Sequence, residues 1–286
     1  MPVAPTTPPA TTAPAGSPSP SEGGSAHVVL VVFENKSYDQ IVGRAAAPTF
    51  NRLISEGALS TAYRAVAHPS LPNYLALVGG STFGIASDCP PSACPVSATN
   101  LGSLLSAHGR TWKAYMESMP STCGTSTTDG YAVKHDPFVY FDDVRTTDLC
   151  RNVVPFGELA ADLAARTLPR FSFVTPNICN DMHDCAVGVG DAWLASFTNA
   201  LFASSAWTAS RSLLIVTFDE DDGAASNRVL TFAVGSPIGR RVVAGTTSGV
   251  GHDHYDLLRT IESVLGVPTL GRNDATAHVM TDLVPG

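Results

Sequence analysis

Two seven-residue apolar runs constrain the fold of this chain more than any other feature of its sequence. They are HVVLVVF at residues 27–33 and SLLIVTF at residues 212–218, and acidic residues follow each of them directly. Runs this short, apolar throughout and rich in β-branched side chains are typical of strands that are buried on both faces of a parallel sheet. The chain is therefore expected to build its core around two such strands.

Helical and extended patterns alternate along the rest of the chain. Further extended segments are predicted at residues 58–67, 111–115, 171–174 and 229–234. Helices are predicted at residues 47–56, 100–108, 156–166, 193–203 and 255–265, and irregular loops at 120–150 and 175–190. This alternation predicts an α/β fold in which helices cover both faces of a mostly parallel sheet, within a single domain at residues 26–286.

The first 25 residues differ sharply in composition from the rest of the chain. They are dominated by Pro, Thr, Ala, Ser and Gly, which bury little apolar surface, so a disordered tether is expected there. No run of 18 apolar residues occurs, so neither a signal peptide nor stable membrane insertion is expected from the sequence as given. The net charge of −8, without any run of Lys or Arg, argues against a nucleic-acid partner.

Six cysteines fall in three pairs that are close in sequence. We expect them to form disulfides in chain order, Cys89 with Cys94, Cys123 with Cys150, and Cys179 with Cys185. A metal site is the alternative, and only the closeness of Cys185 to His183 favours it. Disulfides indicate an oxidising compartment, so together with the tether they predict a protein that is secreted or exported to the cell envelope.

The segment HPSLPNYLALVGG at residues 68–80 carries the first candidate catalytic residue. Pro72 suits the first turn of a helix, and the Gly pair at its end supplies a stop. Ser70 then lies at or just before the helix N-terminus, where unpaired N–H groups favour an anion such as a phosphate. From this segment alone, Ser70 fits equally well as a capping residue or as a nucleophile.

Acidic residues at the ends of the two buried strands suggest a metal site. Glu34 and Asn35 follow the first strand, and Asp219 and Glu220 follow the second. If the strands are parallel, both pairs emerge at one edge of the sheet, and their oxygens suit a divalent cation. Such an ion beside Ser70 would lower the pKa of its hydroxyl. Asp221 and Asp222 are interpreted as part of a turn before Gly223.

Histidines between the predicted elements are further candidates for chemistry. His68, His135, His183, His252 and His254 all fall in loops. An imidazole can ligate a metal, donate to phosphoryl oxygens or protonate a leaving group.

Six segments together resemble the bacterial phosphoesterase family of the alkaline phosphatase superfamily, which contains acid phosphatases and phospholipases C. They are ENKSYDQIVG, HPSLPNYLALVGG, KHDPFVYF, NDMHDCAVGVGDAWL, LLIVTFDEDDG and HYDLLRTIESVLG, which begin at residues 34, 68, 134, 180, 213 and 254. They occur in order over nearly the whole chain after the tether. The likeness is greatest to the secreted acid phosphatases of the family, and it implies a three-layer α/β/α sandwich.

The resemblance also implies roles for individual residues. It assigns Ser70 as the nucleophile, His135 and His183 to the phosphate pocket, and His254 to the head of the final helix. We expect His183 or His254 to protonate the departing alcohol. It assigns metal binding to Glu34, Asn35, Asp219 and Glu220, with Ser70 beside the ion. The pattern suits one divalent ion, with Ca, Mg, Mn and Zn all open. No Arg matches the one that many phosphatases direct at the substrate, and Lys36 or Lys134 is the candidate replacement.

The function predicted from the sequence is therefore a metal-dependent acid phosphatase that acts on phosphomonoesters or phosphoinositide-type substrates through a phosphoserine. Attack on a phospholipid phosphodiester, as in a phospholipase C, is the first alternative, although no basic amphipathic helix is evident for approaching a bilayer. A non-catalytic exported domain that binds a cation is the second.

Overall fold

An eight-stranded sheet forms the centre of the chain. The computed structural model describes Met1 and residues 26–223, 226–238 and 242–285, so the tether predicted at residues 1–25 lies, Met1 apart, outside the described residues. The strand order is β5-β4-β6-β1-β7-β8-β2-β9. The strands are β1 (His27–Phe33), β2 (Ala58–Ser60), β4 (Trp112–Met116), β5 (Val153–Pro155), β6 (Phe171–Thr175), β7 (Ser212–Phe218), β8 (Thr231–Gly235) and β9 (Thr246–Ser248).

The sheet is mostly parallel, as the two apolar runs predict. Strand β1 pairs in parallel with both β6 and β7, and β4 pairs in parallel with β5 and β6. Strand β8 runs antiparallel to its neighbours β7 and β2. Every residue of β7 is buried, and every residue of β1 after His27 is buried, which agrees with central strands that are covered on both faces.

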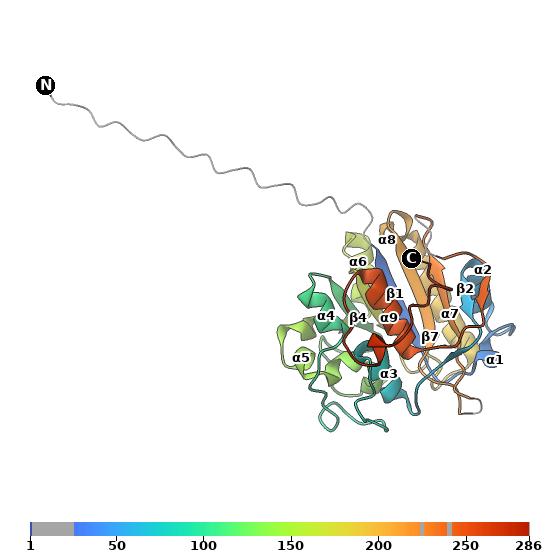
Figure 1. Cartoon of the computed structure of the whole chain (residues 1–286), viewed down its shortest axis with the longest axis horizontal. Coiled ribbons are helices and arrows are strands. Elements are labelled where there is room, and N and C mark those ends of the chain that lie inside the picture. Colours follow the sequence, from blue (N-terminus) through green and yellow to red (C-terminus); the bar gives the residue numbers. More distant parts are fainter. Residues whose placement is uncertain (2–25, 224–225, 239–241, 286) are drawn as a thin grey trace.

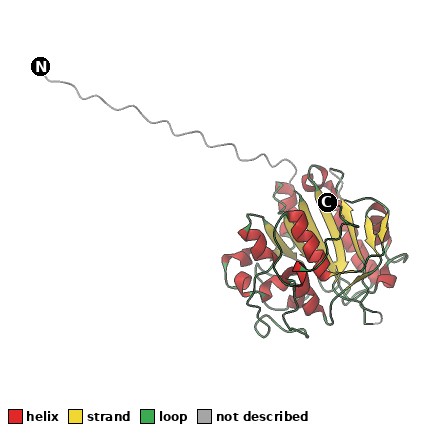
Figure 2. Ribbon diagram, viewed as in Figure 1, coloured by secondary structure: helices red, strands yellow, loops and turns green. Residues whose placement is uncertain are grey.

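Helices cover both faces of this sheet and complete the predicted three-layer α/β/α sandwich (Figures 1 and 2). Helices α3 (Ser70–Gly79), α4 (Leu101–Ala107) and α9 (His254–Leu265) pack on one face. Helices α2 (Pro48–Glu56), α6 (Glu158–Ala165) and α7 (Val187–Ala203) pack on the other face. Three further helices are only four residues long, α1 (Tyr38–Ile41), α5 (Asp142–Arg145) and α8 (Ser205–Thr208).

Alternation along β1 decides which face each side chain meets. The ring of Phe33 packs edge-on against Phe50 of α2 and Trp193 of α7. The distances between ring centroids are 5.1 Å and 5.8 Å. Because successive side chains of a strand point to opposite faces, Glu34 faces the layer of α3 and α9. Phe218 at the end of β7 lies beside Phe33, so Asp219 shares the side of Glu34.

Helix α7 begins earlier than the sequence predicts. The predicted helix starts at residue 193, whereas α7 starts at Val187 and takes up the end of the predicted loop at 175–190. The start could not be predicted because Gly188 and Gly190 lie in the first turns of α7, and glycine has a low helix propensity. Gly190 is needed there, since a Cβ at this position would lie 2.6 Å from the side chain of Met182.

Short strands without an apolar run were also missed. The predicted extended segment at 58–67 contains β2 and β3 (Tyr63–Arg64), but β5, β9 and β10 (His252–Asp253) carry no pattern of their own. Strands β3 and β10 form a separate two-stranded sheet. The predicted loop at 120–150 is partly ordered, because it includes α5 and short 3₁₀ turns.

All three predicted disulfides are present. They join Cys89 to Cys94, Cys123 to Cys150 and Cys179 to Cys185. Cys185 is therefore not a metal ligand. Among the described residues, no helix is long and apolar enough to cross a membrane.

The C-terminal end of α3 is held by a distant part of the chain. Gly80 ends the helix in the left-handed conformation, with φ of 66°. Its carbonyl oxygen accepts a hydrogen bond from the backbone N–H of Asn273 at 3.0 Å. The buried carboxylate of Asp274, which accepts backbone hydrogen bonds from Gly271 and Arg272, lies directly against Gly80.

Replacing Gly80 with alanine should destabilise the protein more than the same change at Gly84. Both glycines have positive φ, but a Cβ at Gly80 would lie 2.4 Å from Oδ1 of Asp274, whereas nothing lies within 4 Å at Gly84. We expect a loss of about 1 kcal/mol for Gly84→Ala, from backbone strain. Gly80→Ala should lose about 2–4 kcal/mol, because overpacking adds to that strain. Thermal unfolding measures both losses. Equal losses would show that the side chain of Asp274 can move away from the added Cβ without lowering the free energy of unfolding.

Candidate active site

The carboxyl ends of β1 and β7 bring the two acidic pairs together, as the sequence predicts. Phe33 and Phe218 are paired residues in the parallel register, so Glu34 and Asp219 leave the sheet side by side. The backbone N–H of Asn35 donates to Oδ1 of Asp219 at 3.2 Å. Glu34 and Asp219 are fully buried and Glu220 is 6% exposed, which is unusual for carboxylates.

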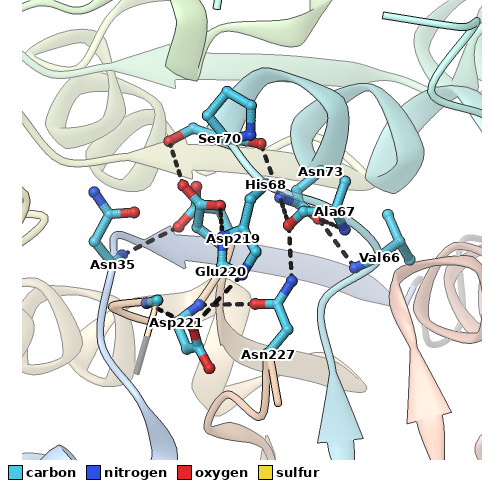
Figure 3. Close-up of polar contacts among 12 residues, drawn as sticks. Asn35, Val66, Ala67, His68, Ser70, Asn73, Asp219, Glu220, Asp221 and Asn227 are labelled. Carbon is cyan, nitrogen blue, oxygen red and sulfur yellow. Dashed lines mark hydrogen bonds and ion pairs between the residues drawn. The ribbon is translucent and has the colours of Figure 1, made fainter. Parts of the chain in front are cut away.

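Ser70 is the first residue of α3, and in Figure 3 it lies above the carboxylates of Asp219 and Glu220. Its Oγ lies 3.1 Å from Oε2 of Glu34 and 3.3 Å from Oε1 of Glu220. Pro69 occupies the capping position, and the hydroxyl of Ser70 makes no capping hydrogen bond. The structural interpretation of Ser70 as a helix cap is therefore wrong.

Two asparagines hold the turn that leads into Ser70. The side chain of Asn73 accepts backbone hydrogen bonds from Val66 and Ala67, both at 3.0 Å. Asn227 donates to the carbonyl of Ala67 at 2.7 Å and accepts from the backbone N–H of Asp221 at 2.9 Å (Figure 3). This turn and the acidic loop after β7 are thus tied together. Sequence reasoning singled out neither asparagine.

A second group of side chains surrounds the other oxygen of Glu34. Nε2 of His135 lies 3.3 Å from Oε1 of Glu34, and Nδ1 of His135 lies 3.1 Å from Oδ2 of Asp181. The hydroxyl of Tyr74 donates to the same Oε1. The ring of Tyr74 stacks on that of His135, with 5.4 Å between the ring centroids. Glu34, His135 and His183 each offer one ligand atom within 4.8 Å of the others. Asp181 and Tyr74 were missed because isolated Asp and Tyr residues carry no pattern.

Each disulfide is close in sequence to residues of this site. Lys134 and His135 fall within the loop that Cys123 and Cys150 close, and His183 falls within the loop that Cys179 and Cys185 close. The third disulfide, Cys89–Cys94, directly follows Asp88. The side chain of Asp88 accepts a hydrogen bond from Lys134 at 2.8 Å.

The two candidate lysines lie in different directions. Nζ of Lys36 donates to the backbone carbonyls of Asn35 and Met182, at 3.2 and 2.7 Å, so its ammonium group is already bound. Nζ of Lys134 lies 3.4 Å from Nε2 of His183 and beside Asp88. Of the two lysines, Lys134 is thus the one that faces His183.

The role predicted for His254 does not fit its position. Nδ1 of His254 lies 2.9 Å from the hydroxyl of Tyr63, and Nε2 lies 2.7 Å from the backbone carbonyl of Asp219. The ring is fully buried, and burial lowers its pKa to about 4. Both ring nitrogens are therefore engaged below the site, where His254 holds the backbone of Asp219 and cannot protonate a leaving group.

His68 takes a place at the site that the sequence did not assign to it. Its Nδ1 bonds to Oε2 of Glu220, and its Nε2 lies 3.6 Å from Oδ1 of Asp221. The only sequence signal was its position two residues before Ser70. His252 lies elsewhere, between Asp256 and Asp282. Asp221 belongs to a turn, as predicted, since its Oδ1 accepts from the backbone N–H of Gly223.

The concentration of buried acids is electrostatically unfavourable. Burial raises the pKa of Glu34 well above its usual range, and the carboxylates of Asp219 and Asp181 raise it further. Burial also raises the pKa of Asp219, Asp181 and Glu220 to about 7 each. Ionising all four together without a compensating cation would be costly.

Two buried oxygens at this point fit a metal ion. Oδ1 of Asn35 and Oδ2 of Asp219 are buried and have no hydrogen-bond partner among the described residues. Buried polar atoms are normally satisfied, and the carboxyl groups of Asp219 and of its neighbours Glu34 and Glu220 all have raised pKa values. Oxygen donors of this kind suit Ca²⁺, Mg²⁺ or Mn²⁺, and the imidazoles of His135 and His183 also suit Zn²⁺.

Comparison with known proteins agrees with this geometry. The model of the Phosphoesterase family matches residues 44–268. A phosphatidylinositol-3-phosphatase from Mycobacterium tuberculosis is 41% identical over 86% of this chain and 79% of its own length. An acid phosphatase from Aspergillus fumigatus is 33% identical over 87% of this chain and 57% of its own length, so this chain spans little more than half of that relative.

The fold agrees as well. A solved structure from Vibrio parahaemolyticus, described as a protein in the alkaline phosphatase superfamily, superposes with a TM-score of 0.59. The match has 17% identity and covers 91% of this chain and 72% of that one. The chain therefore belongs to the Phosphoesterase family, has the fold of the alkaline phosphatase superfamily, and is an acid phosphatase-like hydrolase of phosphoric ester bonds.

Proposed function

We propose that this protein is an exported, metal-dependent acid phosphatase that hydrolyses phosphomonoesters through a phosphoserine at Ser70. One observation carries the proposal: a buried serine hydroxyl stands at the N-terminus of α3 within 3.1 and 3.3 Å of two carboxylates. A hydroxyl among bases, at the positive end of a helix dipole, is suited to attack on an anionic phosphorus centre.

The residues that would hold the metal are Glu34, Asn35, Asp219 and Glu220, with Ser70 beside it. The partnerless oxygens of Asn35 and Asp219 and the raised pKa values of the carboxyl groups support this assignment. When bound, one divalent cation would lower the pKa of the serine hydroxyl and neutralise phosphoryl charge. His135 and His183 lie against Glu34 and are additional candidate ligands.

The chain's own residues would then carry the reaction in two stages. Glu34 or Glu220 accepts the proton of Ser70 as its Oγ forms a bond to phosphorus and the bond to the substrate alcohol breaks. The backbone N–H groups of α3 and the ammonium of Lys134 bind the phosphoryl oxygens. The side chain of His183 is 25% exposed, so it can reach the departing alcohol and protonate it. Water then attacks phosphorus and gives a proton to the now neutral His183, the serine–phosphate bond breaks, and the carboxylate returns its proton to Oγ of Ser70 as phosphate is released.

His135 has a supporting role in this mechanism. It is 3% exposed, and burial lowers its pKa well below the usual range, with Lys134 lowering it further. Its ring nitrogens face Glu34 and Asp181. We therefore assign it to positioning Glu34 rather than to proton transfer.

Substrate class and compartment follow from other observations. The relative from M. tuberculosis is named as a phosphatidylinositol-3-phosphatase, which supports a phosphoinositide-type substrate or another small phosphomonoester. Three disulfides support export to an oxidising compartment.

Removing the hydroxyl of Ser70 should abolish turnover. We expect Ser70→Ala to lower kcat on p-nitrophenyl phosphate by about 10³-fold or more, because no other group can form the covalent intermediate. Ser55→Ala is the matched control, since Ser55 is exposed and, within the described part of the chain, its hydroxyl bonds only to the carbonyl of Arg52. The melting temperatures of both variants should stay close to that of the parent. Retained activity in Ser70→Ala would refute the phosphoserine.

The products formed from a phosphoinositide distinguish the two lipid reactions. On a phosphatidylinositol monophosphate in mixed micelles, we expect free phosphate and intact phosphatidylinositol, because Ser70 attacks the monoester. A phosphatase assay and mass spectrometry of the lipid measure both products. Diacylglycerol with a phosphorylated headgroup would identify a phospholipase C instead.

Stability should depend on pH when divalent cations are removed. The raised pKa values near 7 mean that the folded state binds more protons than the unfolded state between about pH 4 and pH 7. In a chelator, the melting temperature should therefore fall by several degrees as the pH rises through this interval. Excess divalent cation should remove most of the fall, and Asp219→Asn should weaken it. A melting temperature that responds to neither pH nor cation would argue against the metal site.

A further inference from the structure

The carboxylate of Asp88 lies beside the first turn of α3 and is partly exposed. Its Oδ1 accepts a hydrogen bond from the backbone N–H of Leu71 at 3.0 Å, and its Oδ2 accepts one from Nζ of Lys134 at 2.8 Å. Leu71 directly follows Ser70 in the first turn of α3. One acidic side chain thus bridges the helix that carries the serine and the lysine that faces the site.

These two donors are the ones that a phosphoryl group would need. Pro72 has no N–H, so the first turn of α3 offers few backbone donors beside Ser70. One of these donors, the N–H of Leu71, is already hydrogen-bonded to Asp88. Among the described lysines near the site, Lys36 is bound to two backbone carbonyls, which leaves Lys134 as the cation able to meet an anion. The carboxylate of Asp88 therefore makes the contacts expected of a phosphate.

The surroundings of Asp88 allow its side chain to move away from Leu71 and Lys134 without a change in the backbone. Its side chain is 31% exposed, in contrast to the buried carboxylates below Ser70. The following residue is fixed, because Cys89 is bonded to Cys94 and its carbonyl accepts a hydrogen bond from Tyr140 at 2.6 Å. Rotation of the side chain alone would move the carboxylate into solvent while the backbone stays in place.

We propose that Asp88 stands in for the phosphoryl group in the substrate-free protein and that phosphate esters must displace it. This inference rests on the proposed function of the same site. The carboxylate keeps Lys134 and the N-terminus of α3 in position when no substrate is bound. It also competes with phosphate for these donors, so Asp88 lowers the affinity for the phosphoryl group and speeds release of the phosphate product.

Replacing Asp88 with asparagine tests the proposal. The amide oxygen can still accept from Leu71, but the negative charge that binds Lys134 is lost. We expect the KM for p-nitrophenyl phosphate and the inhibition constant of inorganic phosphate both to fall by about tenfold. The dissociation constant of inorganic phosphate, measured by calorimetry, should fall equally, which gives a readout independent of turnover.

Asp142→Asn is the matched control. Asp142 pairs with Arg145 and Ser97 on a surface segment, so its loss changes the net charge equally without touching these donors. We expect its phosphate affinity to stay that of the parent. Melting temperatures of both variants confirm folding.

Three other results would overturn the inference or its basis in distinguishable ways. If Asp88 only holds Lys134 in place, Asp88→Asn would raise the KM and weaken phosphate binding, which contradicts displacement. Unchanged constants would also contradict it, because a competing group would then have been removed without effect. If the parent hydrolyses no phosphate ester, the proposed function fails first, whatever the variant binds.

Discussion

The site depends on the parallel, in-register pairing of β1 with β7. This pairing places Glu34 and Asp219 next to each other although 185 positions separate them in the sequence. Both strands are buried, so the carboxylates that follow them have no access to water in which to separate their charges. The fold thereby creates a concentration of negative charge that a cation and a nearby hydroxyl can use.

Elements packed around this pair supply the remaining groups from distant parts of the chain. Helix α3 brings Ser70 to one side of Glu34, and the loop before α5 brings His135 to the other. Below, His254 at the start of α9 holds the backbone of Asp219 through its ring nitrogen. No single segment forms the site alone, so its residues come together only through the fold.

Those parts of the fold that follow from periodicity could be predicted from the sequence. Strands β1 and β7, the start of α3 at Ser70 and the three disulfides all follow from local patterns. The proximity of Glu34, Asp219, Glu220 and Ser70 also followed, because parallel strands end at one edge. Asp181, Tyr74 and Asp88 could not be found, since their places depend on loop paths that no periodicity encodes. The role of His254 failed for a similar reason, because sequence does not reveal which atoms its ring nitrogens meet.

The disulfides have a consequence for when the enzyme becomes competent. Two of them close the loops that carry His135 and His183, and the third directly follows Asp88. Until these bonds form, the segments around the carboxylates can sample many conformations, whereas the sheet below can already assemble from apolar burial. If the protein is exported as proposed, formation of these bonds would be a late stage in building the site, and a newly made, still reduced chain would lack fixed positions for His135 and His183.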